Sequence, residues 1–208
     1  MRLALAKGRL EGPGWRWLAQ QGVGTASRSG RGLIWTLRPA IEVALVRGRD
    51  IPGLLRQGAV DLGIVGRDVA LDSGEDLWLS EGLGFGLSRL VLAVPTARGA
   101  AGVPLRVATR YPELTRRWFA ARGERVEIVA MAGSVEVAPA LGLADAIVDV
   151  VETGATLRAN GLRLQAVLLE SAAVLAARPG DEAPVLAAIG YAGARDGLER
   201  LADYAADA

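Results

Sequence analysis

The 208-residue sequence contains no cysteine and no histidine. Without cysteine, the chain can form neither disulfide bonds, thiolate nucleophiles nor zinc–sulfur sites. Without histidine, it lacks the commonest general base and the commonest transition-metal ligand, so Ser-His-Asp and Cys-His catalysis are both excluded. Any metal is therefore expected to be a hard cation such as Mg²⁺, held by oxygen ligands and largely by the phosphates of a substrate.

Excess charge and long apolar runs are absent as well. The 24 basic and 23 acidic residues leave a formal net charge of +1, and no basic run with interleaved aromatic residues indicates nucleic-acid binding. The apolar stretch at the amino terminus is too short for a secretory signal and is interrupted by Lys7 and Arg9. No apolar run approaches the length of a membrane span. With 51% hydrophobic residues, we expect a soluble, cytoplasmic, globular protein.

Lysine is almost absent, because Lys7 is the only one among the 24 basic residues. A bias in nucleotide composition explains the abundance of arginine. The single ammonium group, however, lies in a glycine-containing loop after an apolar segment. A compact point charge there suits a phosphate contact that a planar guanidinium does not imitate.

Apolar runs alternate with amphipathic segments, which predicts an α/β protein. The predicted strands are residues 3–6, 33–37, 41–46, 61–65, 87–94, 106–108, 126–129 and 144–151. The predicted helices are residues 14–21, 50–58, 112–122, 134–141 and most of 182–205. The Pro-, Gly- and Ala-rich stretch 95–104 is the best candidate for a hinge or linker.

A faint internal repeat accompanies this alternation. The Gly-x-x-Asp-x-x-apolar pattern of residues 58–64 recurs at residues 142–148. It fits either two related lobes or the general similarity of βα units. In both cases the strand ends at residues 65–66 and 149–150 are expected to face a ligand, as in other open α/β sheets.

The segment around residues 144–157 indicates a phosphate site. A buried strand runs into Thr153-Gly154-Ala155-Thr156, and a helix is expected to begin near Thr156. This order offers backbone N–H groups, two hydroxyls and a helix N-terminus to one anion. Asp149, just upstream, can accept hydrogen bonds from vicinal sugar hydroxyls. A phosphate site beside a carboxylate is what a ribose 5-phosphate requires.

The same segment resembles the signature of the ATP phosphoribosyltransferase family, whose members catalyse the first step of histidine biosynthesis. The residues that fill the signature without a gap are Glu136, Gly142, Ala144, Ile147, Asp149, Thr153, Gly154, Thr156 and Leu157. Further blocks of resemblance occur, in order, at residues 7–10, 61–68, 83–89 and 106–112.

The resemblance implies a two-lobed, periplasmic-binding-protein-like (type II) fold, that of a type IV phosphoribosyltransferase. Lobe I, on the nucleotide side, would comprise residues 1–94 and 172–208, and lobe II, with the phosphoribosyl pyrophosphate loop, residues 95–171. The chain ends where the family's long form begins a histidine-binding domain, so it resembles the short form. The implied partners are a second copy in a homodimer and a regulatory subunit resembling histidyl-tRNA synthetase in a hetero-oligomer.

The implied reaction transfers the 5-phosphoribosyl group of phosphoribosyl pyrophosphate to N1 of ATP and releases pyrophosphate. Phosphoribosyl pyrophosphate would be bound by Glu136, Asp149, Glu152, Thr153, Gly154, Ala155 and Thr156. The leaving group would be neutralised by Lys7, Arg9 and Arg31, with Mg²⁺ carried on the substrate phosphates. ATP would be bound by Arg47, Gly66 and Asp68.

Two alternatives stay open. Where the family usually has a second basic residue after the arginine at position 31, this chain has Gly32, so Arg28 competes with Arg31 for the pyrophosphate contact. The other alternative is a two-lobed small-molecule-binding protein, a solute-binding or sensor protein without catalysis. Such a protein normally carries an export signal or an attached DNA-binding domain, and neither is visible.

Overall fold

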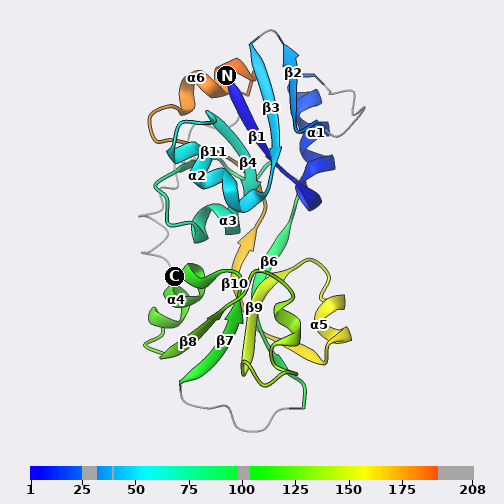
Figure 1. Cartoon of the computed structure of the whole chain (residues 1–208), viewed down its shortest axis with the longest axis vertical. Helices are drawn as coiled ribbons and strands as arrows, with labels where there is room; N and C mark the ends of the chain where they lie inside the picture. The colour runs from blue at the N-terminus through cyan, green and yellow to red at the C-terminus, as the bar shows by residue number, and fades with distance from the viewer. Residues whose placement is uncertain (25–31, 39, 98–103, 192–208) are drawn as a thin grey trace. The chain divides into compact units, whose positions relative to one another are not determined.

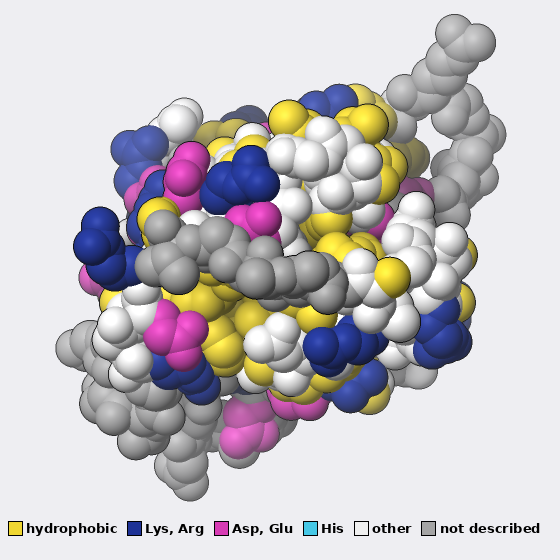
Figure 2. Space-filling view, turned by 90° about the horizontal axis from the view of Figure 1, so that it is seen from below, with side chains coloured by type: hydrophobic (Ala, Val, Ile, Leu, Met, Phe, Trp, Pro, Cys, Tyr) yellow, Lys and Arg dark blue, Asp and Glu magenta, His cyan; other side chains and the backbone are white. Residues whose placement is uncertain are grey.

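The computed structural model describes residues 1–24, 32–38, 40–97 and 104–191, which form two compact units (Figure 1). Met1–Gly86 and the segment from Ala172 build the first unit, and Leu87–Ser171 build the second. No described helix is long and apolar enough to cross a membrane. On the face drawn in Figure 2, basic and acidic side chains are interspersed, and the described residues form no continuous basic surface there.

The first unit contains a six-stranded sheet with the order β2-β3-β1-β4-β11-β5. Its three central parallel strands are β3 (Ile41–Val46), β1 (Arg2–Ala6) and β4 (Leu62–Gly66). The flanking antiparallel strands are β2 (Ile34–Arg38), β11 (Ala173–Ala177) and β5 (Trp78–Leu79). Its helices are α1 (Glu11–Gln20), α2 (Ile51–Arg56), α3 (Arg67–Asp72) and α6 (Glu182–Ala188). β4 is buried along its whole length, as expected for a parallel strand covered on both faces.

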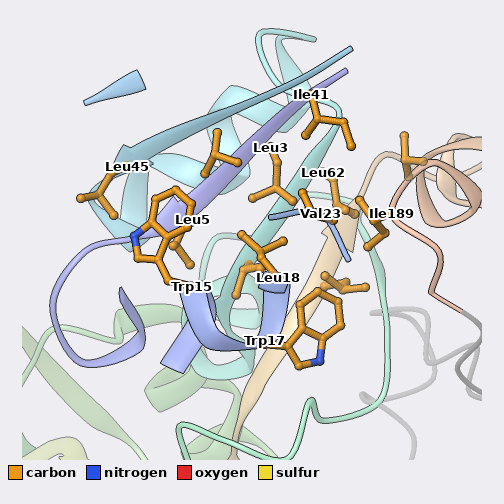
Figure 3. Packing of buried hydrophobic residues seen from close by; sticks show 14 of the residues in the cluster. Leu3, Leu5, Trp15, Trp17, Leu18, Val23, Ile41, Leu45, Leu62 and Ile189 are labelled. Atoms are coloured by element: carbon orange, nitrogen blue, oxygen red, sulfur yellow. The ribbon is translucent and has the colours of Figure 1, made fainter. Parts of the chain in front are cut away.

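Helix α1 supplies much of the core of this unit. Trp15 and Leu18 face Leu5 and its neighbours in the sheet (Figure 3). A Cβ on Gly14 would collide with the side chain of Leu5, so the absence of a side chain lets the helix approach β1 closely. The helix begins at Glu11, three residues before the predicted start at Gly14. Pro13 is tolerated in the first turn, because proline lacks an N–H and the first N–H groups of a helix have no partner within it.

The second unit contains a five-stranded sheet with the order β10-β6-β9-β7-β8. Its strands are β6 (Ser88–Pro95), β7 (Leu105–Thr109), β8 (Val126–Ala130), β9 (Ala146–Val151) and β10 (Leu162–Ser171). β7 runs parallel to β8 and β9, whereas β6 is antiparallel to β9 and β10. The helices are α4 (Pro112–Ala120) and α5 (Ala155–Ala159). Ala108, Ile147 and Leu157 are among the buried residues that join these elements in one core.

The stretch 95–104 is not a linker between the units, contrary to the sequence prediction. It follows β6 and precedes β7, and both strands belong to the sheet of the second unit. Residues 98–103 themselves lie outside the described part. The chain passes between the units at residues 86–87 and 171–172 instead, so the first boundary differs from the expected 94–95. A composition rich in Pro and Gly marks any exposed connection and does not distinguish a hinge from a loop within one sheet.

The predicted helix over residues 134–141 is also wrong. Only a single 3₁₀ turn, η3 (Val135–Val137), forms there. Ser134 adopts a left-handed φ of 49°, and Pro139 has no N–H with which to continue a helix. In the tail, α6 ends at Ala188, and residues 192–208 of the predicted helical segment lie outside the described part.

Candidate functional site

A pocket of about 300 Å³ lies in the second unit, where β9 ends and α5 begins. It is lined by Glu136, Asp149, Val150, Val151, Glu152, Thr153, Gly154, Ala155, Thr156 and Leu157. Every residue that the sequence assigned to phosphoribosyl pyrophosphate therefore contributes to one pocket. The structure brings Glu136, from η3, to the loop that follows β9.

The loop turns at Gly154, which has a φ of +75° and precedes the first turn of α5. Glycine adopts this left-handed conformation without the steric cost that a side chain brings. The Ala155 N–H donates to Thr153 Oγ1 at 3.4 Å. The helix begins at Ala155, one residue before the predicted start. The side chains of Thr153 and Thr156 are exposed, so both hydroxyls are accessible to a ligand.

Asp149 is the buried acid of the pocket, with 7% of its surface exposed. Its Oδ1 accepts hydrogen bonds from Arg110 Nη2 at 2.9 Å, Arg110 Nε at 3.2 Å and the Val150 N–H at 2.8 Å. No described residue donates to Oδ2. That oxygen can therefore accept hydrogen bonds from a bound sugar.

Two opposing effects act on the pKa of the Asp149 carboxyl. Burial raises this pKa above its usual range, and the Arg110 guanidinium and the Val150 N–H counter part of the rise. The negative charge of Glu136 adds a further, smaller rise. Burial also lowers the pKa of Arg110, but the Asp149 carboxylate, Tyr111 and Glu136 together raise this pKa by more, so the guanidinium stays charged.

Sequence reasoning assigned no role to Arg110, although it noted the surrounding block 106–112. Its contact with Asp149 depends on the pairing of β7 with β9, two strands that are distant in sequence. A local motif carries no information about such a pairing. The only usable signal was that an arginine follows one parallel strand and an aspartate lies in another.

The pocket contains three carboxylates, those of Glu136, Asp149 and Glu152. Even so, the described residues include no group of three or more Asp or Glu side chains placed to hold a metal ion.

In the first unit, Lys7, Arg47 and Gly66 lie at one edge of the sheet. Ala6 of β1 pairs with Val46 of β3, and β1 is also parallel to β4, which ends at Gly66. The Lys7 N–H continues this pattern by donating to the Val46 carbonyl at 2.8 Å. Both basic side chains are exposed. The carboxyl edge of parallel strands is where open α/β sheets commonly bind ligands.

The remaining predicted residues have different environments. The Arg9 guanidinium donates from Nη1 to the Gly86 carbonyl at 2.9 Å. Asp68 is buried, with 1% of its surface exposed, and a Cβ on Gly66 would collide with Asp68 Oδ1. The Asp68 carboxylate thus folds back over the end of β4. Arg31 and its alternative, Arg28, lie outside the described residues.

A model of the ATP phosphoribosyltransferase family matches residues 47–187. The ATP phosphoribosyltransferase of Alkaliphilus metalliredigens is 42% identical over 179 residues, which cover 84% of this chain and 86% of the relative. The chain belongs to the ATP phosphoribosyltransferase family. The predicted enzyme class is confirmed with it, and the binding protein without catalysis is not favoured.

The relatives have different lengths. The ATP phosphoribosyltransferase of Methanopyrus kandleri is 41% identical, but its match covers 83% of this chain and only 63% of the relative. The match to the Alkaliphilus protein covers most of both chains. The chain is thus similar in length to the Alkaliphilus relative, and its match spans just under two thirds of the Methanopyrus one.

Solved structures confirm the predicted fold class. The ATP phosphoribosyltransferase (HisG:HisZ) complex from Thermotoga maritima matches with a TM-score of 0.74 and 32% identity, covering 86% of this chain and 88% of the matched chain. The substrate-binding protein of an amino acid ABC transporter matches with a TM-score of 0.59 but only 13% identity. This second likeness concerns the fold alone. It agrees with a periplasmic-binding-protein-like, type II architecture.

Proposed function

We propose that this protein catalyses the first step of histidine biosynthesis. It transfers the 5-phosphoribosyl group of phosphoribosyl pyrophosphate to N1 of ATP and releases pyrophosphate. The main support for this proposal is that one pocket gathers every residue that the family signature assigns to phosphoribosyl pyrophosphate, in a chain that belongs to this family. The other features of the site agree with the demands of that reaction.

The pocket in the second unit suits the ribose 5-phosphate. The backbone N–H groups after Gly154 and the exposed hydroxyls of Thr153 and Thr156 offer several donors to the phosphate. Asp149 and Glu136 offer acceptors for the ribose hydroxyls. Hydrogen bonds to ionised carboxylates are stronger than neutral ones, so these two acids fix the orientation of the sugar.

The chemistry needs no general base. Adenine N1 has a free lone pair that attacks the anomeric carbon as the bond to pyrophosphate breaks, so no proton has to be removed first. This explains how a chain without histidine can catalyse the reaction. The tasks left to the protein are to align two polyanions and to stabilise the separating charges.

These polyanions also require positive charge close to them. We assign the neutralisation of the departing pyrophosphate to Lys7, Arg9 and Arg31, and the binding of ATP to Arg47, Gly66 and Asp68. The exposed positions of Lys7 and Arg47 at one sheet edge support this assignment. We assign Mg²⁺ to the phosphates of the substrate, whose oxygens are the ligands that this cation prefers.

We infer that the chain acts in the cytoplasm, in an assembly with other subunits. The similar Thermotoga maritima structure is a HisG:HisZ complex. By this likeness the chain would form a homodimer and join a regulatory subunit resembling histidyl-tRNA synthetase in a hetero-oligomer. Full activity is then expected only when that subunit is present.

The test is to combine the purified chain and its regulatory subunit with ATP, Mg²⁺ and phosphoribosyl pyrophosphate. The proposal predicts the ultraviolet absorbance of N1-(5-phosphoribosyl)-ATP and one pyrophosphate released for each product formed. Reactions without either substrate serve as controls. A small-molecule-binding protein would bind a ligand without turnover, so tight binding of both substrates without any product would contradict the proposal.

A further inference from the structure

Two Arg–Asp ion pairs join β7 to β9. Arg106 pairs with Asp145 where the strands begin, and Arg110 pairs with Asp149 where β7 ends. Both pairs are separated by 39 residues in sequence. This common spacing follows from the parallel register, in which Val107 lies beside Ala146.

The two pairs differ in how the arginine uses the carboxylate. Arg106 Nη2 donates to Asp145 Oδ1 at 3.1 Å, and its Nε donates to Oδ2 at 3.3 Å. Arg110 instead directs both Nε and Nη2 to Oδ1 of Asp149. Arg106 thus occupies both oxygens of its partner, whereas Arg110 leaves Oδ2 of Asp149 without a donor among the described residues.

Arg110 therefore controls two properties of Asp149. Its two N–H groups, together with the Val150 N–H, hold Oδ1 and so fix the plane of the carboxylate. Its positive charge also opposes the effect of burial, which favours protonation of the acid. The only side chain that brings a cation to this buried acid, among those described, is Arg110.

We propose that Arg110 is a positioning residue for phosphoribosyl pyrophosphate. It acts through Asp149, which it keeps ionised and oriented so that Oδ2 accepts hydrogen bonds from the ribose hydroxyls. The inference rests on the proposed function, because it takes Asp149 as the acid that binds the sugar. Arg110 itself touches no substrate in this account.

The surrounding charges sharpen the consequence of removing Arg110. Glu136, on η3, faces Asp149 and raises its pKa, and Glu152 lines the same pocket. Without the guanidinium, Asp149 would be buried near other acids with only the Val150 N–H to stabilise its charge. Removing Arg110 should therefore raise the pKa of Asp149 further. As the pH is lowered, an Arg110→Ala variant should lose affinity for phosphoribosyl pyrophosphate earlier, that is at a higher pH, than the wild type.

A double-mutant cycle tests the proposal, with calorimetric titration of phosphoribosyl pyrophosphate into the enzyme. We expect Arg110→Ala and Asp149→Asn each to weaken binding by about tenfold or more, since each removes charge-assisted hydrogen bonding at the site. The double variant should bind no more weakly than Asp149→Asn alone. If the losses of affinity in the two single variants multiply in the double variant, Arg110 acts independently of Asp149 and the proposal is overturned.

Two further variants separate positioning from general damage. Arg110→Lys keeps the charge but offers no planar fork, so it should restore part of the affinity and return the pH profile towards that of the wild type. Arg106→Ala breaks the matched pair on the same two strands, and should leave the affinity unchanged even if the melting temperature falls. An equal loss of affinity in Arg106→Ala, or no recovery with Arg110→Lys, would contradict the proposal.

The cycle also separates an error in the assignment of the pocket from an error in the role of Arg110. If Asp149→Asn binds phosphoribosyl pyrophosphate as the wild type does, the assignment of the pocket to the sugar is wrong. If Asp149→Asn binds weakly while Arg110→Ala binds normally at every pH, the pocket assignment stands and only the role of Arg110 is wrong.

Discussion

Asp61 in the first unit and Asp145 in the second make the same pair of backbone contacts. Asp61 Oδ2 accepts from the Arg2 N–H at 2.8 Å, while the Asp61 N–H donates to the Arg2 carbonyl at 2.9 Å. Asp145 repeats this with Arg106, at 3.0 and 2.8 Å. In each unit the aspartate thus ties the start of one parallel strand to its neighbour.

These contacts predict that replacing the aspartate lowers the stability of the protein by different amounts in the two units. Asp145→Ala should lower the free energy of unfolding by about 1.5–3 kcal/mol, because a backbone N–H loses a charged acceptor. Asp61→Ala should cost less, since the Asp61 side chain is 35% exposed and that of Asp145 only 17%. Urea denaturation of both variants checks this. Equal midpoints for Asp145→Ala and the wild type would contradict it.

The Gly-x-x-Asp pattern was visible in the sequence because each copy is local, and it does mark equivalent contacts in the structure. The loop from Thr153 to Thr156 was equally predictable, since strand, turn and helix follow one another without interruption. Arg110 was not, because its contact with Asp149 depends on the register between β7 and β9. The predicted helix over residues 134–141 failed for another reason. Pro139 lacks an N–H and Ser134 has a left-handed backbone conformation, and both prevent a regular helix there.

Gly154 provides a test of the loop geometry. Gly154→Ala should lower stability by about 1 kcal/mol because of its positive φ, and should also weaken the binding of phosphoribosyl pyrophosphate. Gly161→Ala is the matched control, with a φ of +66° and open space where its Cβ would lie. Thermal melting and ligand titration are measured for both. Similar affinities of the two variants would show that the turn at Gly154 has no part in binding.

Lys7 is the only lysine of the chain, and its side chain is exposed at the carboxyl edge of β1. Lys7→Arg should reduce turnover while leaving the melting temperature unchanged, because a planar guanidinium does not replace a compact ammonium at a phosphate. Steady-state kinetics with the regulatory subunit present measures the effect. Turnover equal to that of the wild type would mean that the lysine has no catalytic role.

The pocket after β9 is expected to bind the ribose phosphate of phosphoribosyl pyrophosphate and not ATP. Calorimetric titration of Asp149→Asn and Thr156→Ala with each substrate separately tests it most directly. Each lost charge-assisted bond should cost roughly 1.5–3 kcal/mol of binding to phosphoribosyl pyrophosphate, while binding of ATP should change far less. Unchanged affinity for phosphoribosyl pyrophosphate in both variants would contradict the account.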